Sequence, residues 1–226
     1  MIYITGDTHI PVDIQKLNSK RFPEQKVLTA DDYLIICGDF GGVWDDGSEE
    51  KYWRRWLDQK RFTTLFVDGN HENFDLLYGF PETEFCGGLA HRISDKVYHL
   101  MRGQIFDIDG KRIFTFGGAS SHDRQHRKEG VSWWENELPS ELETERAIAN
   151  LDGVDWCVDA VITHCAPDSI QSLLCDGYES NVLTAFLEEI KRRLSYKKWF
   201  FGHYHIDKAI DGKHRALFDE ITAFEG

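Results

Sequence analysis

The chain has 226 residues, of which 41% are hydrophobic and 29% are charged, and this length suits one domain with a continuous core, 1–226. No apolar run approaches the roughly 20 residues that span a bilayer, which excludes a membrane-spanning helix. The net charge of -13 repels polyanions and disfavours non-specific binding to nucleic acid.

The N-terminus and the cysteines predict a reducing compartment. The chain begins Met1-Ile2-Tyr3-Ile4, without the basic region of a signal peptide, so we expect a cytoplasmic protein. The cysteines are odd in number and form no Cys-x-x-Cys pair, which argues against disulfides and against a thiolate zinc site. We expect reduced, mostly buried thiols at Cys37, Cys86, Cys157, Cys165 and Cys175.

Five short apolar runs are predicted as buried strands, and each is followed at once by polar residues. The runs are 2–5, 33–37, 65–68, 160–163 and 199–201, followed by Gly6-Asp7, Gly38-Asp39, Gly69-Asn70, His164 and Gly202-His203. Buried strands of α/β proteins read as continuous apolar runs, and ligand sites gather in the loops beyond their carboxyl ends. We therefore predict an α/β fold with a site built from these loops.

Three helices are predicted between the strands. Ser48 with Glu49 and Glu50 can start the first, and Ser140 with Glu143 forms a capping box for the second. Their apolar stripes are Tyr52, Trp53, Trp56 and Leu57 in the first, Ala147, Ile148 and Leu151 in the second, and Val182, Leu183, Phe186, Leu187, Ile190 and Leu194 in the third.

Turn signals predict some antiparallel pairing as well. Asp109-Gly110 and Asp211-Gly212 lie between apolar runs and are typical of two-residue hairpin turns. The segment 120–136 is polar and rich in charge and tryptophan, and we interpret it as a loop or a lid over a site.

The polar residues after the strands form a set of oxygen and nitrogen donors. Any one of them is more often a turn former or helix cap than a metal ligand. Together, however, so many polar groups at one edge of a core would be costly without cations, because buried charges must be paired or coordinated. The set is Asp7, His9, Asp39, Asn70, His164, His203 and His205.

In five ordered blocks the chain resembles the calcineurin-like phosphoesterases, the metallophosphoesterase superfamily. The blocks are Gly6-Asp7-Thr8-His9, Gly38-Asp39, Gly69-Asn70-His71-Glu72, Thr163-His164 and Gly202-His203-Tyr204-His205. The resemblance spans residues 6 to 205. It implies a four-layer α/β/β/α sandwich of two mixed β-sheets flanked by helices, with a two-metal centre at the loops of one end.

The resemblance also implies a role for each matching residue. Asp39 would bridge the two metals. One metal would be held by Asp7, His9 and His205, and the other by Asn70, His164 and His203. In the family the second block commonly continues as Gly-Asp-x-x-Asp, whereas here the next acids after Asp39 are Asp45 and Asp46, so substrate approach is expected to differ at this point.

Two cations can bind a bridging hydroxide nucleophile and the phosphoryl oxygens, so no protein nucleophile is required. The resemblance assigns protonation of the leaving alkoxide to His71, and the alternative is that His71 holds Asn70 in place. His122 and Arg124 could reach the substrate phosphate, or could lie in a loop that packs under the site. Trp44 could be a core residue or a platform for a ring, and we favour the core.

These features predict a metal-dependent hydrolase of phosphate monoesters or diesters. The expected cofactors are two divalent ions, with manganese first and iron, zinc, cobalt or nickel as alternatives. The expected partner is a small phosphorylated substrate or nucleotide, or a phosphoprotein. The alternatives are a metal-binding interaction module of the same fold without catalysis, and a protein Ser/Thr phosphatase.

Overall fold

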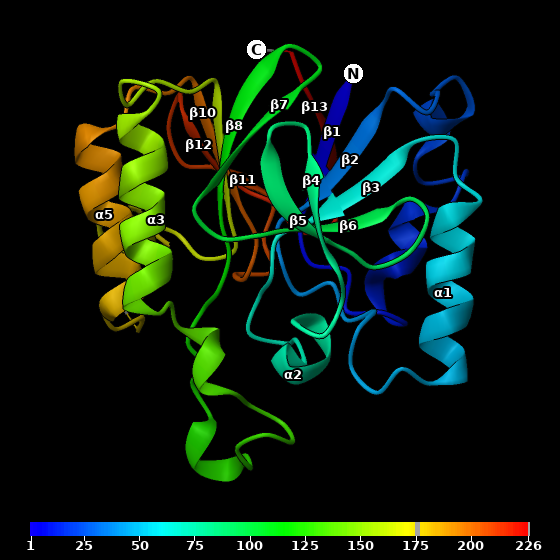
Figure 1. Cartoon of the computed structure of the whole chain (residues 1–226), viewed down its shortest axis with the longest axis horizontal. Helices are drawn as coiled ribbons and strands as arrows, with labels where there is room; N and C mark the ends of the chain where they lie inside the picture. The colour runs from blue at the N-terminus through cyan, green and yellow to red at the C-terminus, as the bar shows by residue number, and fades with distance from the viewer. Residues whose placement is uncertain (175–176, 226) are drawn as a thin grey trace.

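Two mixed β-sheets pack face to face in the structure, a computed structural model that describes residues 1–174 and 177–225 (Figure 1). Helices cover the outer face of each sheet, so the expected α/β/β/α sandwich is confirmed. Parallel and antiparallel pairs occur in both sheets, as the strand runs and the turn signals predicted.

The first sheet contains most of the N-terminal half of the chain. β1, β2, β3 and β6 run parallel to one another, while β13 and β5 pair antiparallel with their neighbours. In spatial order the strands are β13 (Ile221–Phe224), β1 (Ile2–Thr5), β2 (Tyr33–Ile36), β3 (Thr63–Phe66), β6 (Val97–Leu100), β5 (Gly88–Arg92) and β4 (Glu82–Phe85). The strand predicted at 65–68 thus begins and ends two residues earlier.

The second sheet has four central parallel strands and two antiparallel edges. Its order is β11 (Lys208–Ala209), β12 (His214–Ala216), β10 (Lys198–Phe201), β9 (Ala160–Thr163), β8 (Lys111–Phe116) and β7 (Gln104–Ile108). Asp109 and Gly110 form the predicted two-residue turn between β7 and β8, both with positive φ. The turn at Asp211-Gly212 is longer than predicted, because Ala209 pairs with Arg215 across it.

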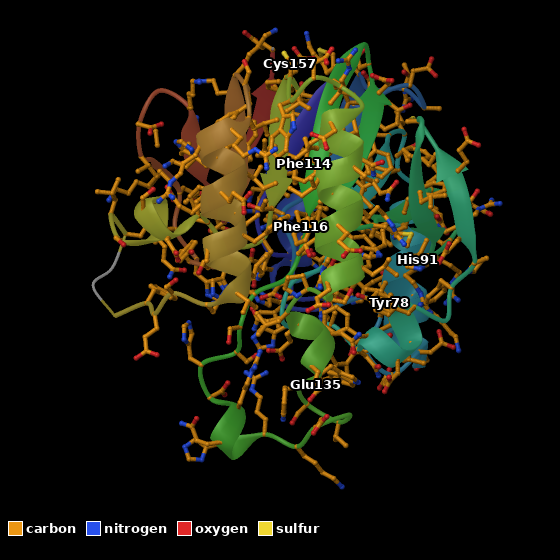
Figure 2. The ribbon with its side chains drawn as sticks, turned by 60° about the vertical axis from the view of Figure 1, so that its left-hand side comes forward. Tyr78, His91, Phe114, Phe116, Glu135 and Cys157 are labelled. Atoms are coloured by element: carbon orange, nitrogen blue, oxygen red, sulfur yellow. The ribbon has the colours of Figure 1, made fainter. Side chains whose placement is uncertain are left out.

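Alternate residues of the strands point into different layers of the core. Ile4, Ile35 and Ile162 lie between the two sheets, whereas Tyr3 and Leu34 face the outer layer. Phe114 and Phe116 of β8 pack under the helices on the far side of the second sheet (Figure 2). Both faces of each central strand are therefore buried, as the continuous apolar runs indicated.

The helices end and begin close to the predicted residues. They are α1 (Ser48–Asp58), α2 (Phe74–Leu77), α3 (Glu141–Asp152), α4 (Asp168–Gln171) and α5 (Val182–Arg193), with single 3-10 turns at Asp13–Leu17, Pro23–Lys26, Arg124–His126 and Glu135–Glu137. The Ser140–Glu143 capping box is confirmed. α1 begins at Ser48 as predicted, with Gly47 at its cap position. Tyr52 and Val182 were assigned to buried stripes but are exposed.

The described cysteines are all free thiols. Cys37 and Cys165 are buried, Cys86 is half-buried and Cys157 is exposed, so burial is less general than expected. Cys175 lies outside the described residues. Within 1–174 and 177–225, no helix has both the length and the apolar character needed to cross a bilayer.

Candidate metal centre

The carboxyl ends of five parallel strands meet at one edge of the sandwich and bring the expected ligands together. Asp7 follows β1, Asp39 follows β2, His164 follows β9 and His203 follows β10. Asp7, His9, Asp39 and His205 offer ligand atoms that all lie within 4.8 Å of one another. Three further expected ligands lie next to this group. His164 contacts Asp39, and it also contacts Asn70 and His203.

One half of the centre is organised around the buried carboxylate of Asp7. Both of its oxygens accept the backbone N–H of His203, at 3.0 and 3.2 Å. Nε2 of His205 lies 3.2 Å from Oδ2 of Asp7, and Nε2 of His9 lies 3.3 Å from Oδ2 of Asp39. Lys16, itself buried, donates to the backbone carbonyls of Gly6 and Asp7 and so holds this loop in place.

The other half is organised around His164, whose side chain is fully buried. Its Nε2 lies 3.3 Å from Oδ1 of Asn70 and 3.3 Å from Oδ1 of Asp39. The ring centroid of His203 is 5.0 Å from that of His164. The amide of Asn70 donates to the hydroxyl of Ser121 at 3.3 Å, which leaves its carbonyl oxygen directed into the centre.

Two of the imidazoles are oriented for ligation by hydrogen bonds on their other nitrogen. Nδ1 of His164 is 2.7 Å from the carbonyl oxygen of Cys37, so it must carry the proton and donate it. Nδ1 of His9 is 2.8 Å from a carboxylate oxygen of Asp13. In both residues Nε2 therefore faces the centre, the arrangement that commonly orients metal-ligating histidines, and a cation bound there would replace any proton on it.

The charges of the site fit a cation. Burial alone would raise the pKa of Asp39, but His164 and His9 hold it well below its usual range. Burial alone would lower the pKa of His164, yet the carboxylates of Asp39 and Asp7 raise it to about 10. A proton on His164 thus compensates buried negative charge that a divalent cation would otherwise balance. Oxygen and nitrogen donors with two carboxylates suit such a cation.

The backbone of the site adopts conformations that L-residues seldom take. His9, Asp39, His203 and His205 all have positive φ, and such strain typically gathers at functional sites. The adjoining glycines allow close approach between loops. A Cβ at Gly69 would overlap a carboxylate oxygen of Asp39, and one at Gly202 would overlap a carboxylate oxygen of Asp7.

His71 and Glu72 lie directly beyond Asn70 and differ in their surroundings. His71 is half-buried at the surface of the centre, with its ring centroid 5.8 Å from that of His9, and burial lowers its pKa despite the nearby Asp39. Glu72 is fully buried and accepts the backbone N–H of Phe40 at 2.7 Å. Glu72 therefore joins the second and third loops and has a structural role.

Asp68, two residues before Asn70, anchors a buried polar cluster. Its carboxylate accepts hydrogen bonds from Arg102 and His99, and Nδ1 of His99 is 2.9 Å from Nδ1 of His91. His91, His99 and His214 all lie outside the centre.

A polar hollow of about 360 Å³ opens over the Asn70 and His203 side of the centre. His122 lines it, with its ring 5.9 Å from that of His203. Among the described residues, Arg124 is not part of the lining. Its guanidinium donates to the buried Glu137 at 3.1 Å and lies against the ring of Trp133.

Arg127 lines the polar hollow where Arg124 was expected. Its guanidinium is held by the carboxylate of Asp123, at 2.7 Å, and by the carbonyl of Ser132. The sequence analysis named only His122 and Arg124 from this segment as candidate substrate contacts. Asp13 and Lys16 were also missed, and only the spacing of four residues between His9 and Asp13 could have indicated one of them.

Comparison with known proteins agrees with this architecture. The sequence model of the calcineurin-like phosphoesterase family matches residues 1–207, and the chain belongs to that family. Membership implies metal-dependent hydrolysis of phosphate esters, and the cluster of aspartates and histidines is where a metal could bind. A search of curated proteins found none that matches the chain.

Proposed function

We propose that the chain is a single-domain phosphoesterase that binds two divalent cations at this centre, with manganese as the expected metal. The observation that supports two ions rather than one is the position of Asp39. One of its oxygens lies 3.3 Å from Nε2 of His9, and the other lies 3.3 Å from Nε2 of His164. A carboxylate between two sets of donors can join two ions.

The donors divide into two groups on either side of Asp39. Asp7, His9 and His205 would hold one ion, and Asn70, His164 and His203 would hold the other. When bound, the ions would lower the pKa of water to supply the attacking hydroxide and would neutralise charge on the phosphoryl group.

Residues around the centre would bind the substrate and transfer a proton. Arg127 and His122 face the polar hollow and would hold non-bridging phosphoryl oxygens, for which a guanidinium is well suited. His71 also lines this hollow and would donate a proton to the departing oxygen. The expected substrate is a small phosphate ester or nucleotide, with a phosphoprotein as the alternative.

A substrate panel tests this proposal. Purified protein is first treated with chelator and then assayed on bis(p-nitrophenyl) phosphate, p-nitrophenyl phosphate and a phosphopeptide with added manganese, iron, zinc, cobalt or nickel. We expect metal-dependent turnover of at least one ester, with manganese most effective. Tight metal binding without turnover of any ester would instead support an interaction module that has kept the fold and lost the chemistry.

A further inference from the structure

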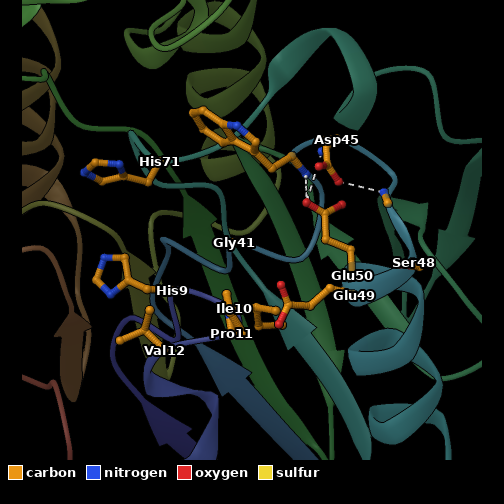
Figure 3. Close-up of a pocket in the computed structure, with 12 residues that line it drawn as sticks. His9, Ile10, Pro11, Val12, Gly41, Asp45, Ser48, Glu49, Glu50 and His71 are labelled. Carbon is orange, nitrogen blue, oxygen red and sulfur yellow. Dashed lines mark hydrogen bonds between the residues drawn. The ribbon is translucent and has the colours of Figure 1, made fainter.

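A second pocket opens beside the metal centre and adjoins the polar hollow at His71, which lines both. It has a volume of about 560 Å³, within the range of small-molecule sites. His9 and His71 line it together with Trp44, after which we name it the Trp44 pocket. Figure 3 shows His9 and His71 on one side of the pocket and Asp45, Ser48 and Glu50 on the other.

The wall next to the centre is apolar. Ile10, Pro11 and Val12 follow the ligand His9 directly and line the pocket, and Val12 is 71% exposed. Trp44 contributes an aromatic surface. Apolar and aromatic linings with a few polar groups are typical of sites for organic ligands, whereas a site for phosphate alone needs no such surface.

Trp44 is held firmly, and it acts both as a packing residue and as a pocket wall. Its ring stands edge-on to the buried Trp134, with centroids 5.4 Å apart. Its backbone N–H donates to Glu50 at 2.8 Å, and its carbonyl accepts from the side chain of Asn73. A wall fixed in advance can bind a ring with little loss of conformational freedom.

The far rim of the pocket is acidic. Both oxygens of Glu50 are occupied by backbone N–H groups, including those of Trp44 and Asp45. Glu49, in the first turn of α1, is exposed and lines the pocket. Its carboxylate repels an additional phosphate or carboxylate, and it can accept hydrogen bonds from N–H donors.

We infer that the Trp44 pocket receives the alcohol part of the substrate, a neutral, ring-bearing group with N–H donors such as a nucleoside with an exocyclic amino group. This inference rests on the proposed function. His71 lies between the polar hollow and the Trp44 pocket, so a phosphate over the centre would have its leaving oxygen on the His71 side. Hydrolysis adds the oxygen of water to phosphorus, breaks the bond to the alcohol oxygen, and releases the alcohol with a proton from water.

Kinetics on matched monoesters test the inference. Adenosine 5′-monophosphate and cytidine 5′-monophosphate are compared with uridine 5′-monophosphate, methyl phosphate and 3-phosphoglycerate, whose leaving group is anionic. We expect the first two to have the highest kcat/KM. Trp44→Ala should lower kcat/KM for the adenosine ester at least about fivefold, since stacking of a base contributes roughly 1–3 kcal/mol. Methyl phosphate should change less than twofold.

Two further variants and one control distinguish an effect on the pocket from general damage to the protein. Val12→Asp alters an exposed side chain and should reduce the preference for adenosine without unfolding the protein. Glu49→Lys should raise kcat/KM for 3-phosphoglycerate. Tyr52→Ala removes an exposed aromatic of α1 that is not part of the described pocket lining, and it should leave every rate unchanged.

Calorimetric binding of adenosine, with no phosphate present, makes the test independent of catalysis. We expect binding to the wild type and its loss in Trp44→Ala and Val12→Asp. Absence of hydrolysis with every metal would refute the proposed function, whereas hydrolysis without adenosine binding would refute only the assignment of this pocket. The assignment would also be refuted if Trp44→Ala lowered kcat/KM equally for adenosine 5′-monophosphate and methyl phosphate.

Discussion

The backbone N–H of His71 donates a 2.8 Å hydrogen bond to Oδ1 of Asp39, so the proposed proton donor also supports the proposed bridging ligand. The support comes from the main chain and not from the imidazole. It fixes the start of the loop after Asn70 against the loop after β2. Replacing the His71 side chain therefore leaves this contact intact, which allows the role of the imidazole to be tested separately from metal binding.

His71→Ala should fold and bind as much metal as the wild type. Loss of a general acid typically costs roughly 10² to 10⁴ in rate, and we expect this loss for an alkyl phosphate ester. A nitrophenyl ester should lose less, because nitrophenolate leaves readily without a proton. Rates on paired alkyl and aryl esters at saturating metal provide the measurement. Equal losses together with reduced metal content would mean that His71 only supports Asn70.

Asp39→Ala should reduce metal content at both positions, because each of its carboxylate oxygens faces a different group of donors. His9→Ala serves as the matched variant and should weaken mainly one position, since Asn70, His164 and His203 are unchanged. Elemental analysis after dialysis measures both variants. Two full equivalents of metal in Asp39→Ala would exclude a bridging role for this carboxylate.

Arg127→Ala should raise KM for a phosphate ester by roughly tenfold, as expected for loss of one charged hydrogen bond worth about 1.5 kcal/mol. Inhibition by inorganic phosphate should weaken by a similar factor. Lys128→Ala removes the same charge from the same segment at an exposed position and is the control. If both variants raise KM equally, the effect comes from the positive charge of the loop and not from direct contact between Arg127 and the substrate.

The buried His91 should make folding stability depend on pH. Burial, with a contribution from His99, lowers the pKa of His91 to about 4 from its usual 6.5. Between these values the unfolded chain binds a proton that the folded protein does not bind. The stabilising contribution is therefore complete above pH 6.5 and is lost as the pH falls toward 4, by about 2 kcal/mol at pH 5.

Urea unfolding at pH 7 and pH 5 checks this dependence. The variant His91→Gln keeps a hydrogen-bonding group beside His99 but cannot titrate, so it should lose less free energy of unfolding than the wild type over this interval. His126→Gln changes an exposed histidine and should behave like the wild type. Identical pH dependence in all three proteins would contradict the assignment to His91.

The layers of the fold and the convergence of the candidate ligands could be predicted because they depend on strand ends. An apolar run fixes where a buried parallel strand ends, and the residues after it must share one edge of the sheet. Edge strands were harder to predict. β4 alternates between exposed and half-buried residues and has few apolar side chains, so its position depends on pairing with β5 and not on its own pattern.

Side-chain direction in the segment 120–136 could not be predicted. Arg124 forms an ion pair with Glu137, a buried carboxylate 13 residues further along the chain, and so does not face the centre. Glu137 also accepts the backbone N–H and the hydroxyl of Ser121. No periodic pattern encodes such a contact.

The most direct test of a two-metal phosphoesterase is a titration of chelator-treated protein with manganese in which bound metal and hydrolysis of bis(p-nitrophenyl) phosphate and p-nitrophenyl phosphate are followed together. We predict no turnover without metal and full activity only when two equivalents are bound, because the nucleophile is generated on the ions. Hydrolysis that survives exhaustive chelation, or that is complete with a single bound ion, would contradict this account.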